Sequence, residues 1–234
     1  MDVNSILNSF MGSGNAGLKR VLGSDDRTFG QGMVGGAAAG GLATMLMSSK
    51  KARKLAGKTL AYGGVLAAGG LAYKVWKDRQ QVSAKSSPRT MTSQPPTLPN
   101  PPTGTIFDLN TEPENPDEDM RLVLIRAMIS AAKADGHIDT DERTTIEEQI
   151  RSLQIGQDEQ RYLVTQLKAP SDPIAIAKLA QSEEQALEIY AASLLAVDID
   201  TQQERHYLDR LADALHLTDD LKHALESEAQ AYQG

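Results

Sequence analysis

The hydrophobic pattern of this chain changes character twice, near residues 80 and 117. Two stretches, 30–49 and 59–76, are rich in glycine, alanine and large apolar residues and carry almost no charge. Residues 81–116 hold few large apolar side chains but eight of the ten prolines. From residue 117 onward, apolar residues recur every three or four positions, the period of a helix with one buried face. The pattern divides the chain into regions 1–80, 81–116 and 117–234.

The helical period of apolar residues in region 117–234 predicts a compact, all-α bundle of about seven helices. Local signals mark where helices begin: Asp172 stands before Pro173, and Thr201 precedes Glu204 with the spacing of a capping box. No stretch alternates apolar and polar residues as a half-buried strand does. A region of this length is large enough to bury a core of its own.

The two glycine-rich stretches have the length and composition of short membrane helices. About 18 residues of helix rise roughly 27 Å, close to the hydrocarbon thickness of about 30 Å. Small residues recur at every fourth position in both stretches, namely at Gly32, Gly36 and Gly40 and at Gly64, Ala68 and Ala72. Such stripes allow close helix packing in lipid. We therefore expect region 1–80 to anchor the chain in membrane lipid and to support a homo-oligomer.

Basic and aromatic residues flank these stretches as they flank membrane helices. The connector between them contains Lys50, Lys51, Arg53, Lys54 and Lys58. Tyr73 and Trp76 stand beside Lys74 at the end of the second stretch, in the manner of interfacial anchors. Because both flanks of 59–76 are basic, the orientation and the choice between one span and a hairpin stay open. A soluble glycine-rich oligomerisation segment is the alternative interpretation.

Charge divides the chain into a basic and an acidic half. Residues 1–116 carry 13 Lys and Arg against 7 Asp and Glu, a net charge of +6. Residues 117–234 carry 11 against 24, a net charge of −13. The acidic half argues against a nucleic-acid partner, whose phosphates it would repel. A protein partner of this half belongs to the alternative interpretation, an adaptor on a long tether. The absence of cysteine excludes disulfides, zinc-thiolate sites and a cysteine nucleophile.

Residues 81–116 have the composition of a linker. Proline, serine, threonine, asparagine and glutamine dominate this region. Such a segment buries too little apolar surface to fold alone. We expect a disordered, semi-extended tether in which only Ile106 and Phe107 dock locally.

The densest cluster of potential metal ligands lies between two predicted helices, from Asp135 to Glu142. On the twelve-residue EF-hand loop, Asp135 takes position 5, Gly136 the sharp turn at 6, Asp139 position 9 and Glu142 position 12. Position 3 is instead Lys133, whose ammonium opposes a cation, so this is not a complete EF-hand. Two interpretations remain open. Either the turn is structural, with Gly136 ending one helix and Asp139 capping the next, or its carboxylates also bind a cation.

A second acidic turn echoes the first. The residues Ile138-Asp139-Thr140 recur as Ile199-Asp200-Thr201, and a glutamate followed by an arginine comes after both. If the two helical pairs pack about a pseudo-twofold axis, their turns face each other, and Asp135, Asp139, Asp198 and Asp200 supply oxygens that each half-loop lacks alone. The alternative is that Asp and Thr simply cap both helical hairpins.

These two turns also carry a resemblance to a known family. Residues 131–142 and 197–208 resemble the TerB-like tellurite-resistance domain, and the whole chain resembles the YebE family of bacterial inner-membrane proteins. The resemblance implies an all-helical fold, inner-membrane localisation, a divalent-cation site and a role in envelope or metal stress response. Carried onto this sequence, the cation site comprises Asp135, Asp139, Glu142, Asp198, Asp200 and Glu204. Gln202 and Gln203 stand where related domains often carry an acid.

No arrangement typical of catalysis accompanies these features. The histidines form no H-x-x-x-H pair, and neither Ser193 nor Thr201 has an obvious base nearby in the sequence. We expect a non-enzymatic, membrane-anchored module that binds a divalent cation of the Ca²⁺ or Mg²⁺ type. The alternative is an adaptor for a protein partner, tethered to the membrane, in which the acidic turns are purely structural.

Overall fold

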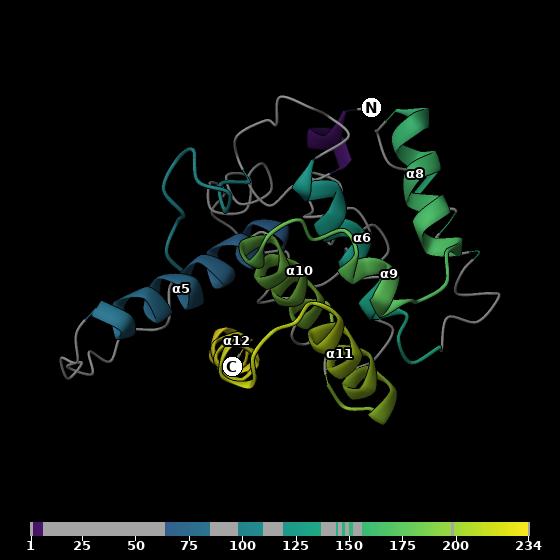
Figure 1. Cartoon of the computed structure of the whole chain (residues 1–234). Coiled ribbons are helices and arrows are strands. Elements are labelled where there is room, and N and C mark those ends of the chain that lie inside the picture. Colours follow the sequence, from purple (N-terminus) through teal and green to yellow (C-terminus); the bar gives the residue numbers. More distant parts are fainter. Residues whose placement is uncertain are drawn as a thin grey trace, which may run out of the picture.

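Residues 2–6, 64–84, 98–109, 119–136, 144, 147, 150–151, 156–197 and 199–233 are described by the computed structural model of the chain (Figure 1). Their helices are α5 (Gly64–Ala84), α6 (Met120–Ala132), α8 (Gln157–Lys168), α9 (Pro173–Ala177), α10 (Glu183–Leu195), α11 (Gln202–Ala214) and α12 (Asp219–Gln233). These ranges contain no strand, so the predicted all-α fold is confirmed for them. Six of the helices belong to region 117–234, where about seven are expected.

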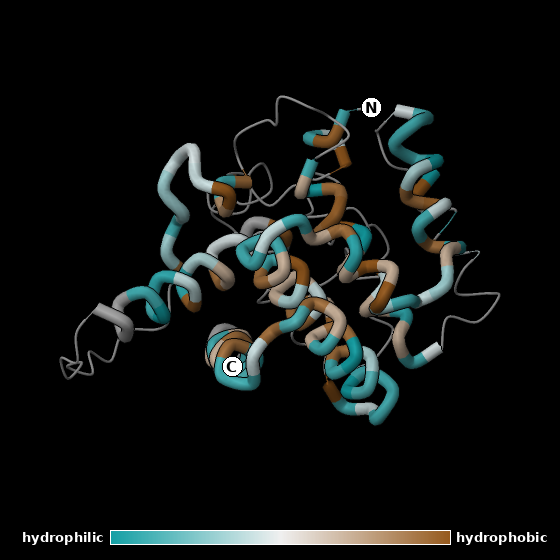
Figure 2. The backbone as a smooth tube through the Cα atoms, viewed as in Figure 1, coloured by the Kyte–Doolittle hydropathy of each residue, from teal (hydrophilic) through white to brown (hydrophobic). Residues whose placement is uncertain are grey.

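Helix α10 forms the centre of the molecule. Every residue from Ala186 to Leu195 is buried, because α5, α6, α9, α11 and α12 all contact this helix. Its start is well defined: the Ser182 side chain accepts a hydrogen bond from the Gln185 amide at 3.3 Å. A helix that is apolar on all sides is stable in water only when other helices surround it. Figure 2 shows the hydrophobic positions gathered along α6 and α10, with hydrophilic positions on the outer turns of α8 and α11.

Helix α5 contains most of the second glycine-rich stretch, and it packs against protein. Val65, Ala68, Leu71 and Ala72 are buried, and α5 contacts α10 and α12 (Figure 1). None of the helices that the structure describes is both long and apolar enough to cross a bilayer. The other predicted membrane stretch, 30–49, lies outside the described residues.

Two ion pairs join basic α5 to the acidic bundle. Lys74 pairs with Glu228 on α12, and Arg79 pairs with Glu183 at the start of α10. The sequence pattern places Lys74 at a membrane interface, but its ammonium is partly buried against α12 instead. The opposite charges of the two halves of the chain therefore meet within one folded unit.

Residues 98–109 correct the expectation of a free tether. Phe107 and Leu109 are buried, and the Phe107 ring lies 5.7 Å from the Tyr73 ring and 5.5 Å from the Trp76 ring of α5. Gly69 permits this approach, since a Cβ there would lie 2.9 Å from the Phe107 carbonyl oxygen. The predicted local docking is confirmed for Phe107, whereas Ile106 is exposed. Aromatic packing on α5 therefore orders this part of the proline-rich region.

Candidate functional site

The first acidic turn begins where α6 ends. Gly136 adopts a left-handed conformation with φ of 70°, and its amide donates to the Lys133 carbonyl at 3.0 Å. The Lys133 ammonium donates to the backbone carbonyl of Gln166 at 3.3 Å and to that of Ala169. Lys133 therefore binds backbone carbonyls at the C-terminal end of α8, where carbonyls lack a partner within the helix. Asp135 is partly buried beside this turn.

The second acidic turn is a helix cap, as the spacing predicts. The Glu204 amide donates to the Thr201 hydroxyl oxygen at 3.2 Å. In return, Glu204 Oε2 accepts from the amides of Asp200 at 3.2 Å and Thr201 at 3.0 Å and from the Thr201 hydroxyl at 2.9 Å. Burial raises the pKa of Glu204, and these hydrogen bonds oppose the rise. The capping box is confirmed, and one oxygen of Glu204 is committed to it.

The six predicted cation ligands are only partly visible. Asp135, Asp200 and Glu204 are described, whereas Asp139, Glu142 and Asp198 lie outside the described residues. Within the portion of the chain that is described, no three His, Asp or Glu side chains converge as metal ligands do. Because half of the predicted set falls outside that portion, the cation site stays a prediction.

A different acidic residue, Glu188, lies in the core. Its side chain on α10 is completely buried, and neither carboxylate oxygen has a hydrogen-bond partner among the described residues. Burial raises its pKa to about 8, so the group is mostly a neutral acid at pH 7. The sequence feature that could have indicated its burial is the position of a single glutamate inside the largely apolar run 186–195.

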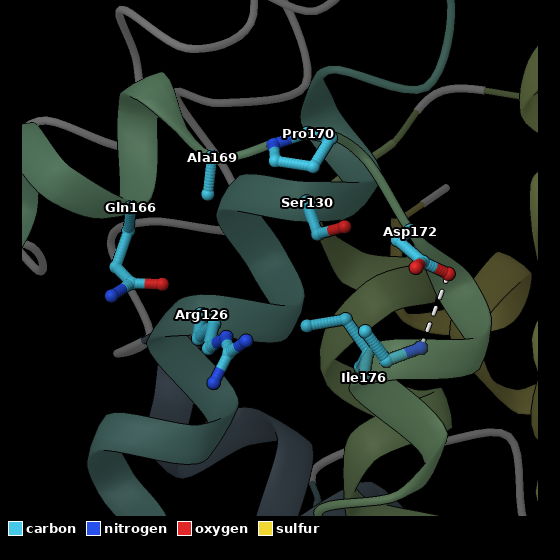
Figure 3. Close-up of a pocket in the computed structure, with 8 residues that line it drawn as sticks. Arg126, Ser130, Gln166, Ala169, Pro170, Asp172 and Ile176 are labelled. Carbon is cyan, nitrogen blue, oxygen red and sulfur yellow. Dashed lines mark hydrogen bonds between the residues drawn. The ribbon is translucent and has the colours of Figure 1, made fainter.

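A small pocket opens where α6, α8 and α9 meet (Figure 3). Its volume is about 80 Å³. Arg126 and Ser130 of α6 and Gln166 of α8 supply polar groups, and Asp172 lies at the start of α9. The remaining wall is apolar and is formed by Ala169, Pro170, Ala175 and Ile176. Nothing in the sequence pattern distinguishes Arg126 from the other polar positions of region 117–234.

Hydrogen bonds fix the floor of this pocket around Ser130. The Tyr207 hydroxyl of α11 donates to the Ser130 hydroxyl oxygen at 3.0 Å, and the Ser171 hydroxyl donates to the Ser130 carbonyl at 2.7 Å. Burial raises the pKa of Tyr207 to about 12, so its hydroxyl remains a donor at physiological pH. Three chain segments are thereby held together at one point of α6.

The structure defines an all-α protein organised around a central buried helix, with a pocket at one side and a capped acidic turn at another. The chain belongs to the family described as "Protein of unknown function (DUF533)", whose model matches residues 32–229. The match includes glycine-rich sequence as well as the helical bundle, in agreement with the packing of α5 on α10.

A curated relative is similar to part of the chain. It is the "Uncharacterized protein in ampR 5'region" of Yersinia enterocolitica, 36% identical over 105 residues. The aligned part covers 45% of this chain and 76% of the relative. No solved structure matches the chain.

Proposed function

We propose that the protein is a non-catalytic helical binding module, held at the bacterial inner membrane by its glycine-rich N-terminal region. The observation that supports this proposal is the docking of α5 on α10 and α12. Because only residues 59–63 separate the basic connector from α5, a membrane segment at 30–49 stands close in sequence to the bundle. A partner bound by the bundle is then held close to the bilayer.

Electrostatics favour the same arrangement. An acidic bundle is repelled by an anionic bilayer surface, whereas each Lys or Arg near such a surface contributes about 1 kcal/mol of attraction. Lys74 and Arg79 are paired within the protein. The five basic residues of the connector 50–58 therefore carry the contact with anionic headgroups in this proposal.

The polar side chains between the described helices bond to one another, which agrees with a binding role and not a catalytic one. The Tyr190 hydroxyl donates to Glu226 at 3.0 Å, and Arg205 donates to the same oxygen at 2.6 Å. Together with the bond between Tyr207 and Ser130, these contacts join one helix to another. His206, His216 and His223 lie exposed on the surface. The bonded groups stabilise the fold, and we assign no catalytic role to them.

Vesicle flotation of the full chain tests the membrane proposal. We expect the chain to float with vesicles that contain anionic lipid. The double variant Ala39→Asp with Leu42→Asp should remain in the dense fraction, because each charge at the bilayer centre costs about 3 kcal/mol. Gln230→Asp, on the exposed face of α12, is the control and should float. Equal flotation of the double variant and the parent chain would contradict anchoring through residues 30–49.

Cation binding in the acidic turns is the second candidate function. The left-handed Gly136 next to Asp135 fits the sharp turn at the sixth position of a calcium loop, and it fits a glycine that ends a helix equally well. The capping role of Glu204 favours the structural alternative for the second turn. The first turn is therefore the better place to test for a cation.

The melting temperature of the full chain, with chelator and then with Ca²⁺, Mg²⁺ or Mn²⁺, tests this candidate. A cation at about 100 times its dissociation constant adds roughly 2.7 kcal/mol, and Asp135→Asn with Asp139→Asn should abolish the gain. Thr201→Ala is the control: it should cost about 1 kcal/mol through loss of the cap and leave the cation response intact. The same melting temperature under all conditions would eliminate cation binding.

A further inference from the structure

We propose that the pocket between α6, α8 and α9 is a carboxylate-binding site centred on Arg126. The pocket does not depend on membrane anchoring or on the acidic turns, so the inference goes beyond the functions proposed above. Its ligand is a carboxylate group on a short apolar stem. The group comes either from a free small carboxylic acid or from an acidic side chain of a partner protein.

Arg126 has no ion-pair or hydrogen-bond partner among the residues that the structure describes. Its guanidinium lies at the pocket. By contrast, Arg121, one turn earlier on α6, forms a buried ion pair with Asp119 at 2.6 Å. A guanidinium presents donors in a planar fork that matches the two oxygens of a carboxylate. Arg126 therefore offers hydrogen-bond donors that none of the described residues uses.

Two other lining residues, Gln166 and Ser130, add hydrogen-bond donors. Gln166 lines the pocket, and its carboxamide makes no hydrogen bond within the described ranges. Ser130 accepts from Tyr207, which leaves its own proton available to a ligand. The Tyr162 hydroxyl, beside Arg126, is already used, since it donates to the Leu122 carbonyl at 3.0 Å.

The charges around the pocket favour an anion. Arg126 carries one positive charge at the pocket, and the Lys133 ammonium lies next to its wall, on the carbonyls of Gln166 and Ala169. Asp172 contributes a negative charge to the pocket. Its Oδ1, however, accepts hydrogen bonds from the amides of Ile174 at 2.9 Å and Ala175 at 3.1 Å (Figure 3). Those amides offset part of its charge. The pocket is thus a positive spot within an acidic region.

Size and wall chemistry define the ligand class. The volume of about 80 Å³ lies well below the roughly 300–1,000 Å³ of pockets that enclose a whole cofactor. The lining also includes four apolar residues, Ala169, Pro170, Ala175 and Ile176. A carboxylate with a few methylene or methyl carbons matches both the polar and the apolar residues of this lining. A nucleotide or a sugar phosphate is too large.

Ligand-observed saturation-transfer NMR on the full chain tests this inference, with acetate and its neutral isostere acetamide as probes at constant ionic strength. We expect acetate to bind and acetamide to bind far more weakly. Arg126→Met keeps the apolar stem and should weaken acetate binding by about tenfold or more. Arg210→Met, at an exposed arginine of α11, is the matched control and should bind as the parent does. Gln166→Leu is a second pocket variant and should weaken binding several-fold.

Two capped tripeptides, Gly-Glu-Gly and Gly-Gln-Gly, distinguish the sources of the carboxylate. Preferential binding of the glutamate peptide over acetate assigns the pocket to an acidic side chain of a partner. Binding of acetate without the peptide assigns it to a free small acid. Equal binding of acetate and acetamide, or full retention of acetate binding by both Arg126→Met and Gln166→Leu, would overturn the proposal.

Discussion

Glu188→Leu is expected to stabilise the protein by about 3 kcal/mol at pH 7, because a carboxyl group with a raised pKa in the fold destabilises the folded state at this pH. Glu188 has a pKa of about 8 in the fold against 4.5 as its ordinary value. Between these two pH values the unfolded chain releases the proton and the folded chain retains it. Rising pH therefore favours unfolding throughout this window.

The pH profile gives the measurement. In urea unfolding, the parent chain should lose stability from about pH 4.5 to pH 8 through this residue, at roughly 1.4 kcal/mol per pH unit. Glu188→Gln and Glu188→Leu should both remove this contribution, and only the leucine variant also avoids a buried unsatisfied polar group. Asp213→Asn, at an exposed carboxylate of α11, is the control and should keep the pH profile of the parent. A leucine variant less stable than the parent at pH 9 would show that Glu188 is not buried without a partner.

Leu71→Ala on α5 is expected to cost about 2–5 kcal/mol, the usual range for a fully buried leucine. Leu71 has no exposed surface, and α5 lies against α10 and α12. Gln80→Ala on the exposed face of the same helix is the control and should change stability by less than about 0.5 kcal/mol. Denaturant unfolding of the full chain provides both numbers. A Leu71 variant as stable as the control would remove α5 from the core.

This prediction also determines which form of the protein should be studied. A fragment that begins at residue 117 lacks α5 and the aromatic contacts of Phe107. The side of α10 covered by α5 would then be exposed to water. Experiments on stability or binding therefore require the full chain.

Local signals in the sequence predicted the helices well. Asp172 before Pro173 and Thr201 with Glu204 both act through hydrogen bonds within a few residues, and both caps are present. Such contacts depend little on the remainder of the fold. The sequence was therefore sufficient for the starts of α9 and α11.

The location of α5 was not predictable in the same way. A run of glycine, alanine and leucine packs closely against helices in lipid and also against a helix in a water-soluble core. Which of the two environments such a helix occupies depends on the element it packs against. For α5 that element is α10, which lies more than a hundred residues away in the chain. Phe107 and Leu109 depend on the same long-range contact, so composition alone predicted a tether there.

The pocket and the buried acid were missed for a related reason. A charged residue in an amphipathic helix is usually placed on the solvent side. Arg126 instead lies between α6, α8 and α9, and Glu188 lies inside the bundle. Whether a charge is paired is a property of the tertiary structure. The six acidic residues predicted as cation ligands could be identified in the sequence because clustered carboxylates form a local pattern.

The most direct test of this account is a thiol cross-link between α5 and α12. The chain has no cysteine, so Lys74→Cys with Glu228→Cys introduces one defined pair, at two side chains that contact each other. Lys74→Cys with His223→Cys is the control, because His223 lies more than a turn away on the exposed face of α12. With a short bismaleimide on the vesicle-bound chain, we predict rapid intramolecular cross-linking of the first pair and little of the second. Equally slow reaction of both pairs would contradict the docking of α5 on the bundle.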